Sequence, residues 1–352
     1  MKSAAKSIIE LMKKEKCRQI TFHLNPDTGM SAIFVIDSVP KDSSSVVSGG
    51  TRFAHTDGDL ALDDCIRLAR AMTRKSNVLG VNDGGAKAIV LANKPKTKEF
   101  LKSVGDFIQL QNGLFRTAID LGFNLSEAEV IASRTKFIDS LSHNIGGLGS
   151  TGENTAEGMI HCFKVISEKL LNKRLEQCKI SIQGLGSVGM PLAKRVVNLG
   201  CEVVASDIDQ TKCDEAKKLG ITIVSPDEIL QQKVDILSPC AFGSVINSNN
   251  IKELRCKIIA GGANNIFENE SLDEELNNLG ITFVPDFVIN CAGFLQALIE
   301  RNKGDVEEAR EKSKIAADKL NQVIEFSRKN NCTLLQSSLK LFGGKNGKNI
   351  NC

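Results

Sequence analysis

A glycine-rich turn is the clearest sign of chemistry in the sequence. Gly184, Gly186 and Gly189 have the spacing GxGxxG, between the apolar run CKISIQ and the helical stretch VGMPLAKR. In a βαβ unit the first glycine permits a tight turn, the second lets a pyrophosphate approach the backbone, and the third lets the helix pack closely on the strand. The free N–H groups and positive dipole end of that helix then favour phosphate binding.

The next apolar run favours NAD as the dinucleotide. CEVVAS ends at Asp207, which follows the glycines at roughly the 20-residue interval expected of a carboxylate that accepts hydrogen bonds from ribose hydroxyls. Such a carboxylate repels the 2′-phosphate of NADP. The alternative is a glycine-rich turn in an α/β domain, with Asp207 capping the following segment.

Three ionisable residues in the first half could act on a substrate. Lys75 ends MTRK, Lys87 ends GGAK and Asp120 ends TAID. Taken alone, these lysines also fit a solvated surface. The glycine pair before Lys87, which leads into an apolar run, sets this lysine apart.

The elements that must position these residues follow a different pattern of apolar and polar residues in each half of the chain. The first half mixes a hairpin signal, helical periodicity and a capping-box pattern of Ser126 with Glu129. We expect strands at 18–25, 31–38 and from Lys87, helices at 60–75 and 100–113, and a glycine-rich hinge at 144–152.

The second half alternates short apolar runs with helical stretches, which is typical of a parallel sheet covered on both faces. A charged amphipathic helix is expected at about 305–328, and a disordered tail over GGKNGKNINC. The expected strands are 178–183, 201–206, 221–224, 234–239, 256–261 and 281–289.

These patterns predict an α/β fold of two domains. Residues 1–145 form an α/β substrate-binding and oligomerisation domain, and residues 146–324 form a Rossmann-type, doubly wound dinucleotide-binding domain. A cleft separates the two domains. Packing of the helices at about 325–345 against the first domain is compatible with this division.

Composition excludes several other classes. The 352 residues carry a net charge of +3, which gives no reason to expect nucleic acid or an anionic membrane as partner. No apolar run approaches the roughly 18 residues of a membrane span. The eleven cysteines are scattered without a CxxC pair and the four histidines lack ligand spacing, so we expect reduced thiols in a cytoplasmic protein and no metal site.

Several motifs, taken together and in order, resemble the glutamate, leucine, phenylalanine and valine dehydrogenase family, nearest to its leucine dehydrogenase branch. The resemblance covers about residues 18–330. Besides MTRK, GGAK, TAID and the glycine turn, it includes GGTR (49–52), PCAFG (239–243), AGGANN (260–265) and PDFVINCAG (285–293).

The resemblance implies a role for each matching residue. Lys75 would bind the α-carboxylate of the substrate, Lys87 would activate water and polarise C2, and Asp120 would shuttle protons. The substrate-binding positions it implies are Gly49, Met72, Ser48, Phe294, Ala297 and Asn264. The cofactor-binding positions are Gly184, Gly186, Ser187, Val188, Gly189, Asp207, Thr155, Ala241, Asn264 and Asn290.

This assignment is chemically consistent. Oxidation of an amino acid leaves an iminium that water must attack, which needs a neutral base, whereas a free lysine has a pKa of about 10.4. Burial near a second ammonium, that of Lys75, would lower the pKa of Lys87. Closure of the cleft would expel water before hydride transfer.

The chain departs from the family at positions that bear on the substrate. Ser48 stands where leucine dehydrogenases have an apolar residue and glutamate dehydrogenases a lysine. Phe294 and Ala297 replace residues that are usually valines, Ala86 replaces a glycine, and the residues after Asp120 also diverge. Without a cation at position 48 a glutamate side chain would be poorly held, so we expect a branched-chain or other apolar side chain.

The expected function is reversible, NAD-dependent oxidative deamination of an L-amino acid to a 2-oxo acid and ammonium, by a homo-oligomer. The first alternative is a catalytically silent relative that binds NAD or an amino acid as a sensor or assembly subunit. The second is a hydroxy acid dehydrogenase, but no histidine lies in a suitable context for that chemistry.

Overall fold

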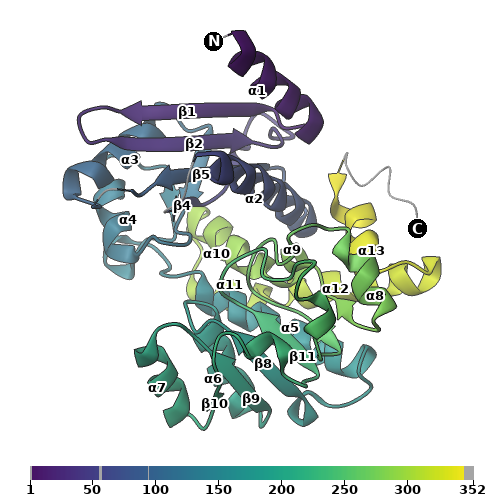
Figure 1. Cartoon of the computed structure of the whole chain (residues 1–352). Coiled ribbons are helices and arrows are strands. Elements are labelled where there is room, and N and C mark those ends of the chain that lie inside the picture. The colour runs from purple at the N-terminus through teal and green to yellow at the C-terminus, as the bar shows by residue number, and fades with distance from the viewer. Residues whose placement is uncertain (1, 55–57, 94, 345–352) are drawn as a thin grey trace. The chain divides into compact units, whose positions relative to one another are not determined.

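The computed structural model describes residues 2–54, 58–93 and 95–344. Contacts divide the chain into two units (Figure 1). The first comprises Met1–Ser150 and Glu300–Lys303, and the second Thr151–Ile299 and Gly304–Cys352. The division therefore falls inside the glycine-rich stretch 144–152.

The first unit is built on a seven-stranded sheet of order β1-β2-β5-β3-β6-β7, in which β4 also pairs with β5. β1 and β2 form the expected antiparallel hairpin, β2 pairs antiparallel with β5, and the other pairings are parallel. Its elements are α1 (Lys2–Glu15), β1 (Gln19–Asn25), β2 (Met30–Ile36), β3 (Val47–Ser48), β4 (Thr51–Ala54), α2 (Gly58–Leu79), β5 (Gly84–Leu91), α3 (Lys98–Leu110), β6 (Phe115–Ala118), α4 (Leu125–Ala132), β7 (Ile138–Asp139) and a short 3-10 turn (His143–Ile145).

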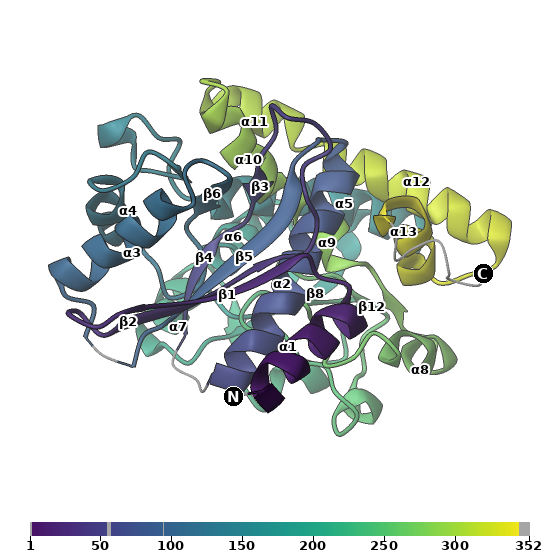
Figure 2. The same ribbon diagram turned by 90° about the horizontal axis from the view of Figure 1, so that it is seen from above.

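Helices cover both faces of this sheet because side chains along a strand alternate between faces. Phe34 and Ala88 point into a core with α3 and α4, whereas Val35 and Ile89 point into a second core with α1 and α2. Figure 2 shows the two helix pairs on opposite sides of the β1–β2–β5 strands. Lys87 alternates with Ala86 and Ala88, so it lies on the α2 face.

The capping-box prediction was wrong by two residues. The N-cap of α4 is Asn124, whose side chain accepts from the backbone N–H of Glu127 while the Glu127 carboxylate accepts from that of Asn124. Ser126 instead donates to Asn124 Oδ1 at 2.7 Å, and Glu129 accepts from Ser142 at 2.5 Å.

The second unit contains a six-stranded parallel sheet of order β10-β9-β8-β11-β12-β13. That order, outward in both directions from the first strand, defines the doubly wound Rossmann fold. Its elements are α5 (Gly152–Lys169), β8 (Lys179–Gln183), α6 (Gly189–Asn198), β9 (Glu202–Ser206), α7 (Gln210–Lys218), β10 (Thr222–Ile223), β11 (Ile236–Pro239), β12 (Ile258–Ile259), α8 (Leu272–Asn278), β13 (Thr282–Phe283), α9 (Asp286–Ile289), α10 (Cys291–Arg301), α11 (Val306–Lys312), α12 (Ile315–Asn330), α13 (Leu334–Phe342) and three short 3-10 turns.

Two expectations about this unit need correction. The apolar run 281–289 is a strand only over β13, because Pro285 precedes the short helix α9. The single helix expected over 305–328 is two helices, α11 and α12, separated near Ser313. α12 and α13 belong to the second unit, and most of the tail, 345–352, lies outside the described residues.

None of the helices that the structure describes is both long and apolar enough to cross a membrane. All ten cysteines in the described ranges are free thiols, and most are buried. Burial raises the pKa of the Cys65 and Cys256 thiols to about 12, so both stay protonated and unreactive near neutral pH.

Candidate active site

Lys87 is placed on β5 by the two glycines before it. A Cβ on Gly85 would lie 2.2 Å from the backbone nitrogen of Thr73, so only glycine lets α2 pack this closely on β5. Lys87 follows two residues later on the same face and is 3% exposed. The Lys87 side chain is therefore buried on the face of the sheet that α2 covers.

Asp120, just after β6, pairs directly with Lys87 through its Oδ2. Arg52 on β4 donates from Nε to the same oxygen at 3.1 Å, and from Nη1 to Asp64 on α2 at 2.9 Å. Two cations and two carboxylates thus form one partly buried network. Arg52 belongs to the GGTR motif, but nothing in that motif assigns it a role.

The pKa values of Lys87 and Asp120 both lie below their usual ranges, for different reasons. Burial lowers the pKa of Lys87, Asp120 opposes that effect, and the charge of Arg52 adds to it. For Asp120, burial favours the neutral acid, but Lys87 and Arg52 outweigh it and hold the pKa well below its usual range. The network therefore keeps a carboxylate ionised beside a lysine that loses its proton more readily than usual.

Glycines also keep the space beside Lys87 open. A Cβ on Gly50 would lie 3.2 Å from Lys87 Nζ and 2.9 Å from Asp120 Cβ. A Cβ on Gly49 would lie 1.8 Å from the carbonyl oxygen of Ala86, so only glycine lets the segment between β3 and β4 run this close to β5.

Lys75 lies on α2, two residues after the Thr73 that touches Gly85, and is buried. Met72 is half-buried on the same helix. The charge of Arg52 lowers the pKa of Lys87, and a further contribution from the ammonium of Lys75 stays a prediction. Binding of a carboxylate by Lys75 stays a prediction.

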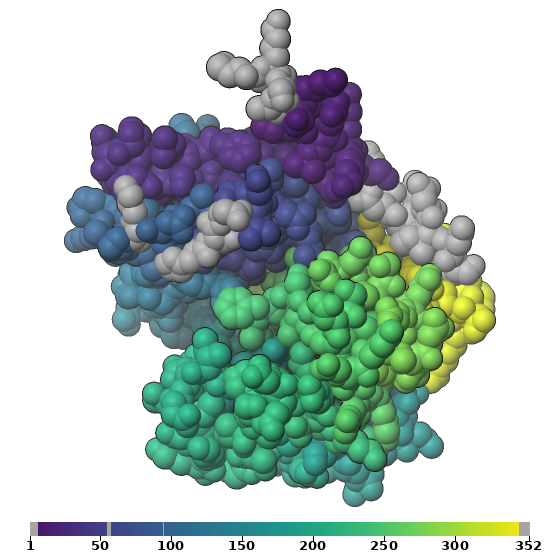
Figure 3. Space-filling view, viewed as in Figure 1, coloured from purple at the N-terminus to yellow at the C-terminus, as the bar shows by residue number. Residues whose placement is uncertain are grey.

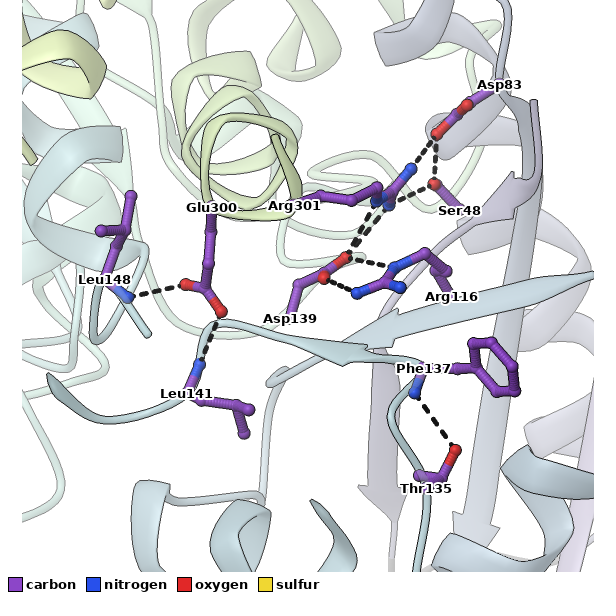
Figure 4. Close-up of polar contacts among 10 residues, drawn as sticks. All are labelled: Ser48, Asp83, Arg116, Thr135, Phe137, Asp139, Leu141, Leu148, Glu300 and Arg301. Atoms are coloured by element: carbon purple, nitrogen blue, oxygen red, sulfur yellow. Dashed lines mark hydrogen bonds and ion pairs between the residues drawn. The ribbon is translucent and has the colours of Figure 1, made fainter. Parts of the chain in front are cut away.

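A second charged network lies around Ser48 at the end of β3 (Figure 4). Arg301, in the last turn of α10, donates to Ser48 Oγ at 2.9 Å and to Asp83 at 2.7 Å. Arg301, Ser48 and Asp83 all belong to the first unit. Residue 48 itself is not a cation, and the fold brings the guanidinium of Arg301 there from a distant part of the chain.

The glycine turn has the geometry that a dinucleotide requires. Gly184 has a φ of +91°, and a Cβ on Gly189 would lie 1.8 Å from the Gly184 carbonyl oxygen. A Cβ on Gly186 would meet nothing within 4 Å, so its backbone is open to a ligand. Ser187 and Val188 complete the turn, and α6 begins at Gly189.

Asp207 follows β9 and is nearly buried beside this turn. Its carboxylate accepts from the backbone N–H of Leu185 at 2.6 Å and from that of Asp209 at 2.9 Å. These bonds fix the carboxylate next to the glycines, as ribose recognition requires.

The remaining predicted cofactor residues lie on loops and helix starts of the second unit. Asn290 donates to Asn264 Oδ1 at 3.0 Å, and its own Oδ1 is buried without a hydrogen-bond partner among the described residues. Thr155 on α5 lies next to Gly293, where an added Cβ would meet its Oγ1 at 2.4 Å, and Ala241 contacts Gly184. Phe294 is half-buried and Ala297 buried on α10.

These features fit NAD: an open glycine backbone at a helix N-terminus, a fixed carboxylate beside the glycine turn and a buried amide oxygen on Asn290 without a hydrogen-bond partner among the described residues. Together with the lysine–aspartate pair of the first unit, they define a dinucleotide-dependent oxidoreductase. The model of the Glu/Leu/Phe/Val dehydrogenase dimerisation domain matches residues 15–145, and the Glutamate/Leucine/Phenylalanine/Valine dehydrogenase model matches residues 207–340. The chain belongs to the Glu/Leu/Phe/Val dehydrogenase family.

Known members of this family match most of the chain. It is 30% identical to the leucine dehydrogenase of Thermoactinomyces intermedius, over 92% of this chain and 88% of that protein. It is 32% identical to the L-tryptophan dehydrogenase of Nostoc punctiforme, over 95% and 94%. The NAD-binding domain of D-isomer-specific 2-hydroxyacid dehydrogenases also matches, over residues 147–257 only. The protein is therefore an oxidoreductase that uses NAD.

Solved structures agree with this assignment. The crystal structure of the Nostoc punctiforme L-tryptophan dehydrogenase superposes with a TM-score of 0.74, at 30% identity, over 95% of this chain and 97% of that one. A hetero-hexameric glutamate dehydrogenase from Thermus thermophilus has a TM-score of 0.77 at 18% identity, over 96% and 93%, which shows the shared fold.

Proposed function

We propose that the protein catalyses the reversible oxidative deamination of an L-amino acid with a branched-chain or other apolar side chain. The observation that carries this proposal is the buried Lys87, hydrogen-bonded to Asp120 and lowered in pKa by burial and by Arg52. A buried lysine held next to an ionised carboxylate suits a reaction that needs a base and a proton carrier at one carbon.

Each catalytic residue then has a defined task. NAD, when bound, accepts the hydride from the substrate Cα. Neutral Lys87 takes a proton from the water that attacks the iminium carbon, and as an ammonium it stabilises negative charge on the carbinol oxygen. Asp120 carries protons between the substrate nitrogen and Lys87 while the C–N bond breaks and ammonia leaves as ammonium.

The other predicted residues bind and orient. Lys75 holds the substrate α-carboxylate, and Gly49 and Met72 line the same side of the substrate. Ser48, Phe294 and Ala297 surround the side chain. Gly184, Gly186, Ser187, Val188 and Gly189 hold the pyrophosphate, Asp207 the ribose, and Thr155, Ala241, Asn264 and Asn290 the region around the nicotinamide, with Asn264 also near the substrate.

The two alternatives have less support. A catalytically silent relative would gain nothing from an intact network of Lys87, Asp120 and Arg52. A hydroxy acid dehydrogenase would share only the dinucleotide-binding part, which is the part that the 2-hydroxyacid dehydrogenase model matches.

One assay separates these readings: NADH oxidation by the purified protein with a panel of 2-oxo acids, with and without ammonium. We expect turnover only when ammonium is present, and the highest kcat/KM with apolar oxo acids. Turnover without ammonium would support the hydroxy acid reading, and no turnover with any oxo acid would support the silent one.

We also propose that the protein is a homo-oligomer in which β1 contributes to the subunit contact. β1 is an edge strand, and Phe22 and Leu24 on it are 55% and 66% exposed. An edge strand with exposed apolar side chains is a surface for pairing with another chain. In Figure 3 the β1–β2 hairpin and α1 form the purple surface at one border of the first unit.

A further inference from the structure

We propose that Asp83 determines the substrate specificity of this enzyme by neutralising Arg301 beside Ser48, and that loss of the Asp83 charge admits substrates with a side-chain carboxylate. The inference rests on the proposed function, since it concerns the side chain of the amino acid. It assigns roles to two residues, 218 positions apart in the sequence, that no motif singles out.

The contacts of Arg301 place a cation at the end of β3. Its Nη1 donates to Asp83 at 2.7 Å, its Nη2 donates to Ser48 Oγ at 2.9 Å, and its Nε and Nη2 donate to Asp139 at 3.3 and 3.1 Å. Ser48 Oγ in turn donates to Asp83 at 2.6 Å. Figure 4 shows the guanidinium between the two carboxylates.

This cluster lies on the same face of the sheet as the catalytic lysine. Ser48 pairs with Gly85 on β5 and with Arg116 on β6, and paired residues in a parallel ladder point to the same face. Gly50 is two residues beyond Ser48 and lies against Lys87 Nζ. The Ser48 side chain is therefore about 7 Å along the strand from the position next to Lys87.

A substrate whose reacting carbon lies at Lys87, and whose side chain extends toward Ser48 as proposed above, meets this cluster. Arg116 and Arg301 both donate to Asp139, and Arg301 also donates to Asp83. These two guanidiniums and two carboxylates balance in charge.

Arg301 can only donate hydrogen bonds, and it has one N–H group left to donate. A guanidinium has five N–H groups, and the contacts above use four of them. Beside the side chains of Arg301 and Asp83, an incoming carboxylate meets as much negative as positive charge and would lose its hydration without a matched partner. An apolar side chain carries no such penalty.

Removing only the charge of Asp83 changes this balance. Asn has nearly the same shape and its carbonyl still accepts from Arg301 or Ser48, but the cluster gains a net positive charge. Arg301 can then bind a carboxylate with charge-assisted hydrogen bonds.

The test compares wild type with Asp83→Asn, using the oxo acids of leucine and glutamate. We expect the ratio of kcat/KM for the glutamate oxo acid to that for the leucine oxo acid to rise at least tenfold, mainly through a lower KM for the acidic substrate. The double variant Asp83→Asn, Arg301→Gln should lose this gain, because the gain depends on the guanidinium. Asp106→Asn, which removes a surface carboxylate paired with Arg134, should leave the ratio unchanged.

A binding measurement keeps the inference testable apart from turnover. Glutarate binding to the NADH-loaded protein should tighten at least tenfold in Asp83→Asn, measured by calorimetry, and Asp83→Ser replaces that variant if it is unstable. An unchanged ratio and unchanged glutarate binding in a folded variant would overturn the proposal, as would a gain that survives the loss of Arg301. If wild type turns over no oxo acid, the proposed function fails while the glutarate result still decides the role of Asp83.

Discussion

At the scale of single residues, the network around Lys87 explains how a buried lysine can serve as a base. Burying an ammonium is costly unless it is paired, and Asp120 supplies the partner. Arg52 holds Asp120 by a second hydrogen bond and adds a positive charge near Lys87. Asp64 in turn pairs with Arg52, so that each charge has a partner.

Arg52 should therefore set the pH at which the enzyme becomes active. Its charge lowers the pKa of Lys87, so Arg52→Gln should raise that pKa, and the fraction of neutral Lys87 should fall at a given pH. We expect the acid limb of the kcat/KM profile for deamination to move to higher pH, with activity on that limb roughly tenfold lower.

The matched control is Arg134→Gln, which removes an exposed arginine paired with Asp106. It should leave the pH profile in place. A profile for Arg52→Gln that keeps its wild-type position, or moves to lower pH, would contradict the role of Arg52.

The motifs of the first unit led from sequence to Lys87 and Asp120, and the structure brings these two side chains together. Arg52 stood in a recognisable motif, but its bond to Asp120 depends on how β4 lies beside β6. Arg301 could not be predicted to reach Ser48, because 253 residues separate them and no periodicity links them. Contacts of that kind follow from topology, which a linear pattern does not contain.

At the scale of elements, alternation and glycine position predicted most strands. β1 and the six strands of the parallel sheet lie inside the predicted runs, and β2 begins one residue before its run. Boundaries failed where two local signals overlap. Asn124 with Glu127 and Ser126 with Glu129 have the same capping-box spacing, and Asn and Ser are about equally good N-caps. The structure uses the first pair because α4 begins one residue before Ser126.

The edge strand β1 leads to a prediction about assembly. Phe22→Lys should weaken self-association, because burying a phenylalanine side chain contributes about 1.5–3 kcal/mol, which corresponds to at least tenfold in a dissociation constant. Light scattering over a concentration series should show wild type as a homo-oligomer and the variant shifted toward smaller species.

Leu110→Lys offers a comparison, since Leu110 at the end of α3 is also an exposed apolar residue. It should associate like wild type. A monomeric wild type, or an unchanged molar mass for Phe22→Lys at every concentration, would rule out β1 as a subunit contact.

At the scale of the whole molecule, the pattern of apolar and helical runs changes near the glycine-rich stretch 144–152 and predicts two units. Nothing in the pattern predicts that the end of α10 belongs to the first unit. Glu300 accepts from the backbone N–H groups of Leu141 and Leu148, and Arg301 binds Asp83 and Asp139 (Figure 4). A continuous helix gives no local sign that its last turn has different partners from the rest.

The central claim is that Lys87 is the base of the reaction, and Lys87→Ala tests it most directly. With ammonium and an apolar oxo acid that wild type reduces, we predict that turnover falls by at least 10²–10⁴-fold, the contribution expected of a positioned acid–base group. NADH binding, followed by fluorescence titration, should stay at the wild-type affinity because the dinucleotide site is in the other unit. Turnover within tenfold of wild type by a variant that binds NADH normally would contradict the account.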